Sequence, residues 1–264
     1  MSFLAKLQRR WETSGSMLCV GLDPDVARLP GSMNGRADAL ADFCIEIVDA
    51  TAEHVCAFKP QIAYFAAVGA ESQLERVCAH IRSAHPDVPL ILDAKRGDIG
   101  DTAKLYAREA FERYNADAVT VNPYLGTDSL EPFLSWSGRG VIVLCRTSNA
   151  GSGTFQSQLV DGTPLYEHVA RRAANEWAQI GEVGLVVGAT YPEELARVRS
   201  LVGDIPLLVP GVGAQGGDAA TVLRVSRASN GYGLIINSSR AVLYASSGDD
   251  FAAAAAEVAR TTLP

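Results

Sequence analysis

Residues 92–103, LDAKRGDIGDTA, bring two cations and three acids together in one short segment. The segment overlaps the end of the apolar run 88–92, which is typical of a buried strand. Because side chains alternate along a strand, Asp93 and Lys95 are expected on one face, where a carboxylate and an ammonium would share a pocket. An isolated Asp-x-Lys pair would be an exposed ion pair of little energetic value. The apolar strand and a further acid, Asp98, favour a catalytic pair instead.

Polar side chains also follow most of the other apolar runs of the chain. They are Asp23 and Asp25, Lys59, Asn122, Arg146 with Ser148 and Asn149, Gln215, Asn237 and Arg240. Taken singly, Asp25, Asn122 and Asn237 are typical of turns and helix caps. Taken together, the set indicates an active site built at the ends of strands.

The apolar runs alternate with helical patterns. Eight strand-like runs occur at 17–22, 55–59, 88–93, 118–121, 140–145, 183–187, 206–209 and 233–236. Between the first two, Leu40, Phe43 and Ile47 recur at helical spacing, and similar stretches separate most of the other runs. Eight β-then-α units predict a (β/α)8 TIM barrel, a single domain of residues 1–264, with its site at the C-terminal ends of the strands. A doubly wound open sheet is the alternative.

Two glycine-rich segments follow predicted strands. Residues 210–217, PGVGAQGG, can bring backbone N–H groups close to an anion. Arg240 follows the eighth run, and the loops after strands seven and eight are a frequent phosphate site in such barrels. Residues 148–163, SNAGSGTFQSQLVDGT, form either an active-site cover or a mobile surface loop.

Composition narrows the class of protein. A net charge of −7 and a pI near 5.2 argue against general binding to nucleic acid or anionic membranes. No stretch approaches the roughly 20 apolar residues of a membrane span, and the first residues lack the apolar core and cleavage site of a signal peptide. A cytoplasmic protein is expected.

The cysteines and histidines do not predict a metal site. The cysteines are odd in number and mostly lie within apolar runs, which predicts reduced core thiols. They are Cys19, Cys44, Cys56, Cys78 and Cys145. The four histidines, His54, His80, His85 and His168, show no ligand spacing and are interpreted as helix or loop residues.

The motif Asp93-x-Lys95-x-x-Asp98 with Thr102, joined to LDPD, FKPQIAYF and PGVGAQGGD, resembles orotidine 5'-phosphate decarboxylase over nearly the whole chain. FKPQIAYF and LDAKRGDIGDTA are similar to the subgroup often called type 2. The resemblance implies a dimeric eight-stranded β/α barrel that converts orotidine 5'-monophosphate to uridine 5'-monophosphate and carbon dioxide. This is the last step of new pyrimidine nucleotide synthesis, and the family performs it without cofactor or metal.

The resemblance also implies roles for the charged residues. Lys95 would protonate C6 of the pyrimidine, with Asp93 beside the substrate carboxylate and Lys59 linking the charged row to the ribose. Asp98 would complete the row. In the family, the acid at the Asp98 position and the threonine at the Thr102 position reach into the neighbouring subunit's site, which implies a homodimer.

The remaining implied contacts hold the substrate. Asp23 would hold a ribose hydroxyl, and Ser148 would face the pyrimidine edge. Gln215 and Arg240 would hold the phosphate, with Pro210 at the start of the phosphate loop. The chain departs from the family after Ser148, because Ala150 replaces the usual proline.

The residue types fit this chemistry. Loss of carbon dioxide leaves a carbanion at C6 that the ring cannot readily delocalise, so preorganised positive charge is needed there. A held lysine ammonium supplies that charge and can then deliver its proton. Alternation of Lys59, Asp93, Lys95 and Asp98 would keep each costly buried ion paired.

Three other functions compete with this interpretation. A magnesium-dependent sugar-phosphate decarboxylase or aldolase of the same superfamily would carry an acidic metal ligand where this chain has Lys59. A Schiff-base aldolase would use Lys95 as a nucleophile, although Asp93 and Asp98 favour its protonated form. A non-catalytic nucleotide-binding or scaffold barrel would have little need for four neighbouring ions.

Overall fold

The computed structural model describes residues 1–33, 35–212 and 218–263. Within these ranges, eight parallel strands form one sheet in the order β2-β1-β10-β9-β8-β5-β4-β3. The strands are β1 (Leu18–Leu22), β2 (Ala57–Pro60), β3 (Ile91–Arg96), β4 (Ala118–Val121), β5 (Gly140–Arg146), β8 (Glu182–Val187), β9 (Leu207–Val209) and β10 (Leu234–Ser238). Bridges Phe58–Leu90 and Gln61–Asp93 join the two ends of the sheet, so it curls into a nearly closed barrel.

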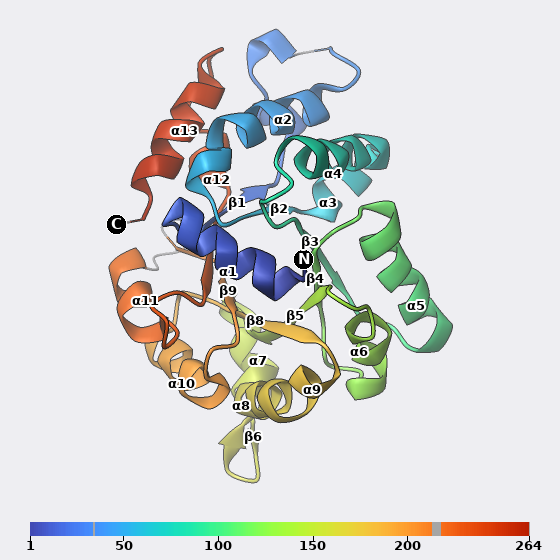
Figure 1. Cartoon of the computed structure of the whole chain (residues 1–264), viewed down its shortest axis with the longest axis vertical. Coiled ribbons are helices and arrows are strands. Elements are labelled where there is room, and N and C mark those ends of the chain that lie inside the picture. Colours follow the sequence, from blue (N-terminus) through green and yellow to red (C-terminus); the bar gives the residue numbers. More distant parts are fainter. Residues whose placement is uncertain (34, 213–217, 264) are drawn as a thin grey trace.

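Helices surround the strands on the outside (Figure 1). The longer ones are α1 (Phe3–Ser14), α2 (Ala39–Thr51), α4 (Glu71–Ala84), α5 (Gly100–Arg108), α6 (Thr127–Leu134), α8 (Leu165–Arg172), α10 (Pro192–Val202), α11 (Ala219–Ser226) and α13 (Phe251–Thr261). Shorter ones are α3 (Ile62–Ala66), α7 (Gly153–Gln156), α9 (Ala178–Ile180), α12 (Arg240–Leu243), the 3-10 turns η1 (Val26–Arg28), η2 (Gly31–Met33), η3 (Ala52–His54) and η5 (Ala150–Ser152), and the π-helical turns η4 (Glu109–Arg113) and η6 (Ala173–Trp177). The predicted (β/α)8 barrel is confirmed, and the open-sheet alternative is wrong.

Helix α1 closes the N-terminal end of the barrel and crosses in front of it in Figure 1. The Trp11 Nε1–H donates to the carbonyl of Leu234 at 2.9 Å, and the Arg10 Nε–H donates to the carbonyl of Val55 at 2.8 Å. The Phe3 ring fills the space where a side chain on Gly140 would stand. These contacts tie the helix to the starts of several strands. The sequence analysis did not anticipate this element.

All five cysteines are buried and carry free thiols in the described structure. Burial raises the pKa of Cys19 and of Cys78 to about 12, so neither thiol ionises at neutral pH. The prediction of buried core thiols is confirmed.

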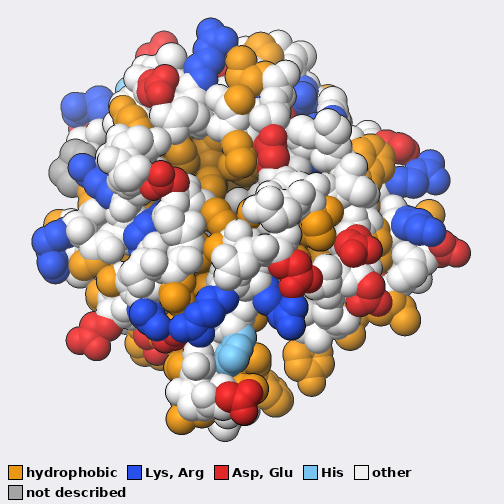
Figure 2. All heavy atoms as spheres, turned by 60° about the horizontal axis from the view of Figure 1, so that its bottom comes forward, with side chains coloured by type: hydrophobic (Ala, Val, Ile, Leu, Met, Phe, Trp, Pro, Cys, Tyr) orange, Lys and Arg blue, Asp and Glu red, His pale blue; other side chains and the backbone are white. Residues whose placement is uncertain are grey.

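Residues 148–163 contain more structure than the sequence indicated. They include η5, α7 and the strand β6 (Leu159–Val160), which pairs with β7 (Thr163–Pro164) in a hairpin. The hairpin projects from the body of the molecule, and hydrophobic side chains are exposed at this projecting end (Figures 1 and 2). Leu159 is 65% exposed. The segment is therefore a connection with short helical turns and a β-hairpin rather than an irregular loop.

Two of the three residues assigned to turns or caps behave as predicted. The Asp25 carboxylate accepts the N–H of Ala27 at 2.9 Å, and the Asn122 side chain accepts the N–H of Tyr124 at 3.0 Å. The assignment of Asn237 is wrong, because β10 extends through it to Ser238.

No helix in the described ranges combines the length and the apolar character needed to cross a membrane.

Candidate active site

Three charged side chains meet at the C-terminal ends of β2 and β3. Lys59 Nζ lies 2.7 Å from Asp93 Oδ2, and Lys95 Nζ lies 2.6 Å from Asp93 Oδ1. The side chains of Lys59 and Asp93 are 5% and 7% exposed, whereas that of Lys95 is 45% exposed. One carboxylate thus holds a buried ammonium on one oxygen and an accessible ammonium on the other.

A bulge in β3 places Lys95. The pairing with β4 shifts between Leu92 and Arg96, and Lys95 adopts φ 46°, in the left-handed region. The Oγ1 of Thr120 accepts the N–H groups of Ala94 and Lys95, each at 3.0 Å, and donates to Asp93 Oδ1 at 2.9 Å. A left-handed lysine costs of the order of 1–3 kcal/mol, and these contacts offset that cost. Asp93 and Lys95 do form an ion pair, but the bulge rather than regular alternation brings the two side chains together.

Electrostatics keep the buried pair ionised. Burial alone would raise the pKa of Asp93, but the charges of Lys59 and Lys95 outweigh it and hold that pKa well below its ordinary value. Burial alone would lower the pKa of Lys59, but the charges of Asp93 and Asp23 hold it above its ordinary value. The buried Lys59–Asp93 pair therefore stays ionised throughout the neutral range.

Two acceptors beside this row lack partners. Asp23, which directly follows β1, has a buried Oδ1 that makes no hydrogen bond within the described structure, and the same is true of Asn237 Oδ1 on β10. A buried acceptor without a donor is costly, so such atoms are suited to a ligand that brings O–H or N–H groups.

Asp98 and Thr102 lie apart from the three paired ions. Asp98 is half-buried in the loop between β3 and α5, where its Oδ1 accepts the N–H of Ile99 at 2.8 Å. Thr102 is exposed on the first turn of α5. Among the described contacts of this chain, neither residue touches Lys59, Asp93 or Lys95.

Ser148 is half-buried just after β5 and is held by a close approach of two strands. The Gly188 N–H, at the end of β8, donates to the carbonyl of Arg146 at 2.7 Å. A Cβ on Gly188 would lie 2.8 Å from the Ser148 Cβ and 2.9 Å from its backbone nitrogen. Only glycine leaves room for the Ser148 backbone here.

The side chain of Arg146 holds the segment that follows Ser148 in place. The buried Arg146 guanidinium forms an ion pair with Glu194 and a hydrogen bond with Ser152, and Gln156 Oε1 accepts the Thr147 N–H at 2.8 Å. Arg146 is therefore a support for the loop.

Only some of the residues expected to bind phosphate lie within the described ranges. Pro210 is half-buried directly after β9, and its carbonyl accepts the N–H of Ala189 at 3.0 Å. Arg240 is exposed at the first position of α12, directly after β10. Gln215 lies outside the described residues. Pro210 and Arg240 therefore stand after the two strands, β9 and β10, where the sequence predicted them.

Comparisons with known proteins agree with this geometry. The family model described as "Orotidine 5'-phosphate decarboxylase / HUMPS family" matches residues 16–257. The chain belongs to this family.

Relatives in the orotidine 5'-phosphate decarboxylase family match the chain along its whole length. A protein named orotidine 5'-phosphate decarboxylase from Janthinobacterium sp. (strain Marseille) is 58% identical over 99% of this chain and 97% of its own length. A protein of the same name from Bordetella pertussis is 60% identical over 98% of this chain and 96% of its own. The solved structure of Leishmania donovani OMP decarboxylase superposes with a TM-score of 0.84 at 40% identity, covering 98% of this chain and 96% of that chain.

Other charged residues of the family motif segment have structural contacts. Arg96 forms a bidentate ion pair with Glu109 and lies over the Tyr106 ring. Asp101 pairs with Lys104 at the exposed surface of α5. Both pairs lie outside the Lys59–Asp93–Lys95 row.

Two supporting residues of this family member were missed by sequence reasoning. Thr120 gives no signal because it lies within the apolar run of β4, and only the neighbouring strand shows its contact with Asp93. Gly188 follows β8 without any motif around it. A small residue at a strand end, where other strands carry polar groups, is the one signal that could have identified Gly188.

Proposed function

We propose that this chain catalyses the decarboxylation of orotidine 5'-monophosphate to uridine 5'-monophosphate and carbon dioxide, the last step of new pyrimidine nucleotide synthesis. The observation that carries the proposal is the Lys59–Asp93–Lys95 row at the ends of β2 and β3. Relatives of nearly 60% identity over the full chain bear the name of this enzyme.

Lys95 is the acid in this proposal. Its ammonium is the accessible cation of the row, and Asp93 fixes it at 2.6 Å. When the bond from C6 to the carboxylate breaks, its electron pair stays on C6, and the ammonium stabilises that charge before transferring a proton to C6. Because its hydrogen bonds are already in place, the site needs little rearrangement as charge develops.

Lys59 and Asp23 bind the ribose in this proposal. Lys59 is buried and paired with Asp93, and Asp23 has an acceptor oxygen free for a hydroxyl donor. Ser148 faces the pyrimidine edge from the end of β5. Pro210, Gln215 and Arg240 complete the site at the phosphate, where a guanidinium gives charge-assisted hydrogen bonds.

We further propose that the active unit is a homodimer in which Asp98 and Thr102 enter the neighbouring site. Exposed apolar side chains on the segments that follow β3 and β4 support this arrangement. They are Ile99 (57% exposed), Leu105 (60%), Tyr124 (79%) and Leu125 (46%). Apolar groups gathered in this way are typical of a surface that is covered by a partner.

Two finer assignments belong to the proposal. The motifs FKPQIAYF and LDAKRGDIGDTA support membership of the type 2 subgroup. Five free and buried thiols are typical of proteins from a reducing compartment, which supports a cytoplasmic location.

The magnesium-dependent alternative is disfavoured by the position of Lys59. The alternative requires an acidic ligand at the end of β2, and this chain places there a buried ammonium bonded to Asp93. A divalent cation at that position would be repelled by the ammonium and would have to displace it from its carboxylate.

The proposal is tested by following the ultraviolet change as orotidine 5'-monophosphate is consumed by chelator-treated protein. Lys95→Ala should lower the rate by at least about a thousandfold, because it removes both the stabilising charge and the proton donor. Lys104→Ala is the matched control, since it deletes an ammonium that is 68% exposed and paired with Asp101 on the surface of α5.

Metal-free turnover that is lost in Lys95→Ala and kept in Lys104→Ala supports the proposal. No turnover of orotidine 5'-monophosphate, together with magnesium-dependent turnover of a sugar phosphate, would favour the sugar-phosphate alternative. A folded wild-type chain that binds a uridine monophosphate analogue without turning over substrate would favour the non-catalytic barrel.

A further inference from the structure

Asp49, His80 and His85 converge on the outside of the barrel, away from the proposed active site. Asp49 lies near the end of α2, His80 lies near the end of α4, and His85 caps α4. Helices of such a barrel run back against its strands, so these helix ends lie at the N-terminal end of the barrel. Lys95 and its partners stand at the opposite end.

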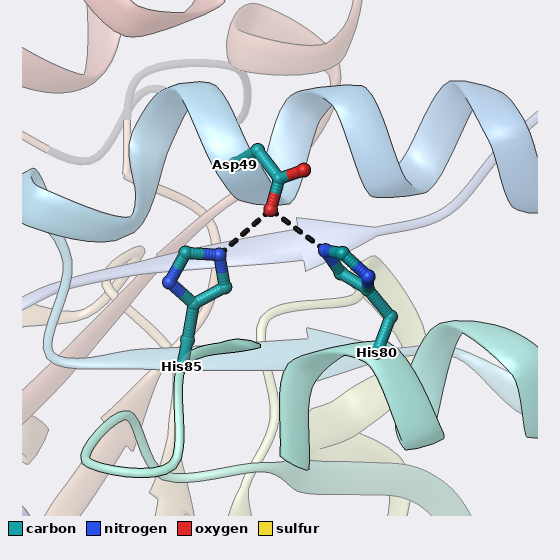
Figure 3. A group of neighbouring side chains, drawn as sticks. All are labelled: Asp49, His80 and His85. Atoms are coloured by element: carbon teal, nitrogen blue, oxygen red, sulfur yellow. Dashed lines mark hydrogen bonds and ion pairs between the residues drawn. The ribbon is translucent and has the colours of Figure 1, made fainter. Parts of the chain in front are cut away.

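The two imidazoles share one oxygen of the carboxylate. His80 Nε2 and His85 Nε2 each lie 2.7 Å from Asp49 Oδ1. Figure 3 shows the two rings turned toward this oxygen from either side of it. Possible ligand atoms of the three residues all lie within 4.8 Å of one another. We propose that Asp49, His80 and His85 form a binding site for a divalent transition-metal ion, and that the bound ion is zinc.

The distances suit such an ion after small side-chain rotations. A tetrahedral zinc ion with bonds of about 2.1 Å keeps its ligand atoms about 3.4 Å apart. The two contacts of 2.7 Å must therefore lengthen by about 0.7 Å, and each ring must carry its proton on Nδ1 so that Nε2 offers a lone pair. Two imidazoles and one carboxylate leave a fourth position for water.

The surroundings favour a cation. Carbonyl groups at the C-terminal ends of α2 and α4 carry partial negative charge, which attracts positive ions.

The site is open enough to load. The side chains of Asp49, His80 and His85 are 50%, 26% and 21% exposed. Imidazole and carboxylate ligands suit zinc, nickel, cobalt and copper. They disfavour the soft ions that prefer thiolate ligands. A bound ion would join α2 to the segment that leads into β3, which makes it a structural clamp.

The test is zinc binding to the chelator-treated full-length chain, measured by calorimetry. We expect one equivalent of zinc per chain and a higher midpoint of thermal unfolding when zinc is present, because the ion binds the folded state. Asp49→Asn, His80→Gln and His85→Gln should each weaken zinc binding by more than about tenfold. His54→Gln is the matched control, because His54 ends η3 just beyond α2 and belongs to no ligand group in the described structure.

A measurement on the wild-type chain keeps the test independent of whether the variants fold. In imidazole nitrogen NMR spectra, zinc should shift the Nε2 signals of His80 and His85 and leave those of His54 and His168 in place. Absence of zinc binding to the wild-type chain, or equal binding by the three variants, would overturn the site. Decarboxylase activity is not the readout, so failure of this inference leaves the proposed function untouched.

Discussion

At the scale of single residues, Asp93 organises the site by binding both lysines and Thr120. Sequence patterns identified Asp93 and the two lysines as polar residues at the ends of apolar runs, but missed Thr120, which lies within the apolar run of β4. Asp-x-Lys in one segment is visible in the sequence, whereas a contact with the next strand appears when the chain folds.

Asp93→Asn should lower the free energy of unfolding by about 3–5 kcal/mol at neutral pH, because it leaves the buried Lys59 without a counter-charge. Since the folded-state pKa of Asp93 lies below its unfolded value, the wild-type advantage is complete above about pH 4 and is lost as pH falls through the folded value. Urea denaturation of both proteins at a series of pH values measures this gap. A gap that stays constant into acid would contradict the ion-pair origin.

Arg240→Ala should lower kcat/KM for orotidine 5'-monophosphate by about a hundredfold while the chemistry continues, because the guanidinium binds the phosphate far from C6. Arg224→Ala, which removes an exposed arginine from the end of α11, is the control. Steady-state kinetics with orotidine, which lacks the phosphate, give the sharper test. Arg240→Ala and wild type should act equally on orotidine, and a large difference would remove Arg240 from the phosphate site.

At the scale of elements, all eight barrel strands were visible in the sequence, because strands buried on both faces consist of nearly continuous apolar residues. Their ends were less certain. The third run begins at residue 88, but β3 begins at Ile91, since the preceding residues meet β2 through a single bridge at Leu90. The hairpin β6–β7 was missed because two-residue strands carry no usable periodicity.

The cluster of Asp49, His80 and His85 was also invisible in the sequence. His80 and His85 are five residues apart, a spacing that puts no two residues on one helix face, and Asp49 lies 31 residues before His80. Helix packing and a cap residue bring these three side chains together.

Gly188→Ala should disturb the loop that carries Ser148 more than it disturbs the barrel. The added Cβ would meet Ser148 atoms at 2.8–3.0 Å, so the loop must shift, and a displacement of about 1 Å near a substrate can cost about a hundredfold in rate. Gly31→Ala is the control, because a Cβ there meets nothing within 4 Å. Kinetics and thermal unfolding of both variants check this. Unchanged kcat/KM in Gly188→Ala would mean that catalysis does not depend on this position of the Ser148 backbone.

At the scale of the whole molecule, the charged row is complete in one chain except for Asp98. The family motif includes this acid, yet its described contacts in a single chain stop at its own loop. An active unit of two chains would reconcile these observations.

Mixing inactive Lys95→Ala and Asp98→Ala chains should restore activity if each site combines Lys95 of one chain with Asp98 of the other. A random mixture gives half mixed dimers, each with one intact site of two, so about a quarter of wild-type activity is expected. The assay is turnover after the two proteins are dissociated and reassociated together. Activity that stays at the level of the separate variants would place both residues in the site of one chain.

The closure of the barrel by α1 has a consequence for how the protein is made. The Trp11 indole bonds to the carbonyl of Leu234, 223 residues further along the chain. At about 5–20 residues per second, a ribosome needs about 11–45 s to synthesise the intervening chain. During that time the Trp11 indole lacks the strand whose carbonyl it bonds to in the folded chain. Closure of the N-terminal end of the barrel by α1 is therefore completed only after the last strand has been synthesised.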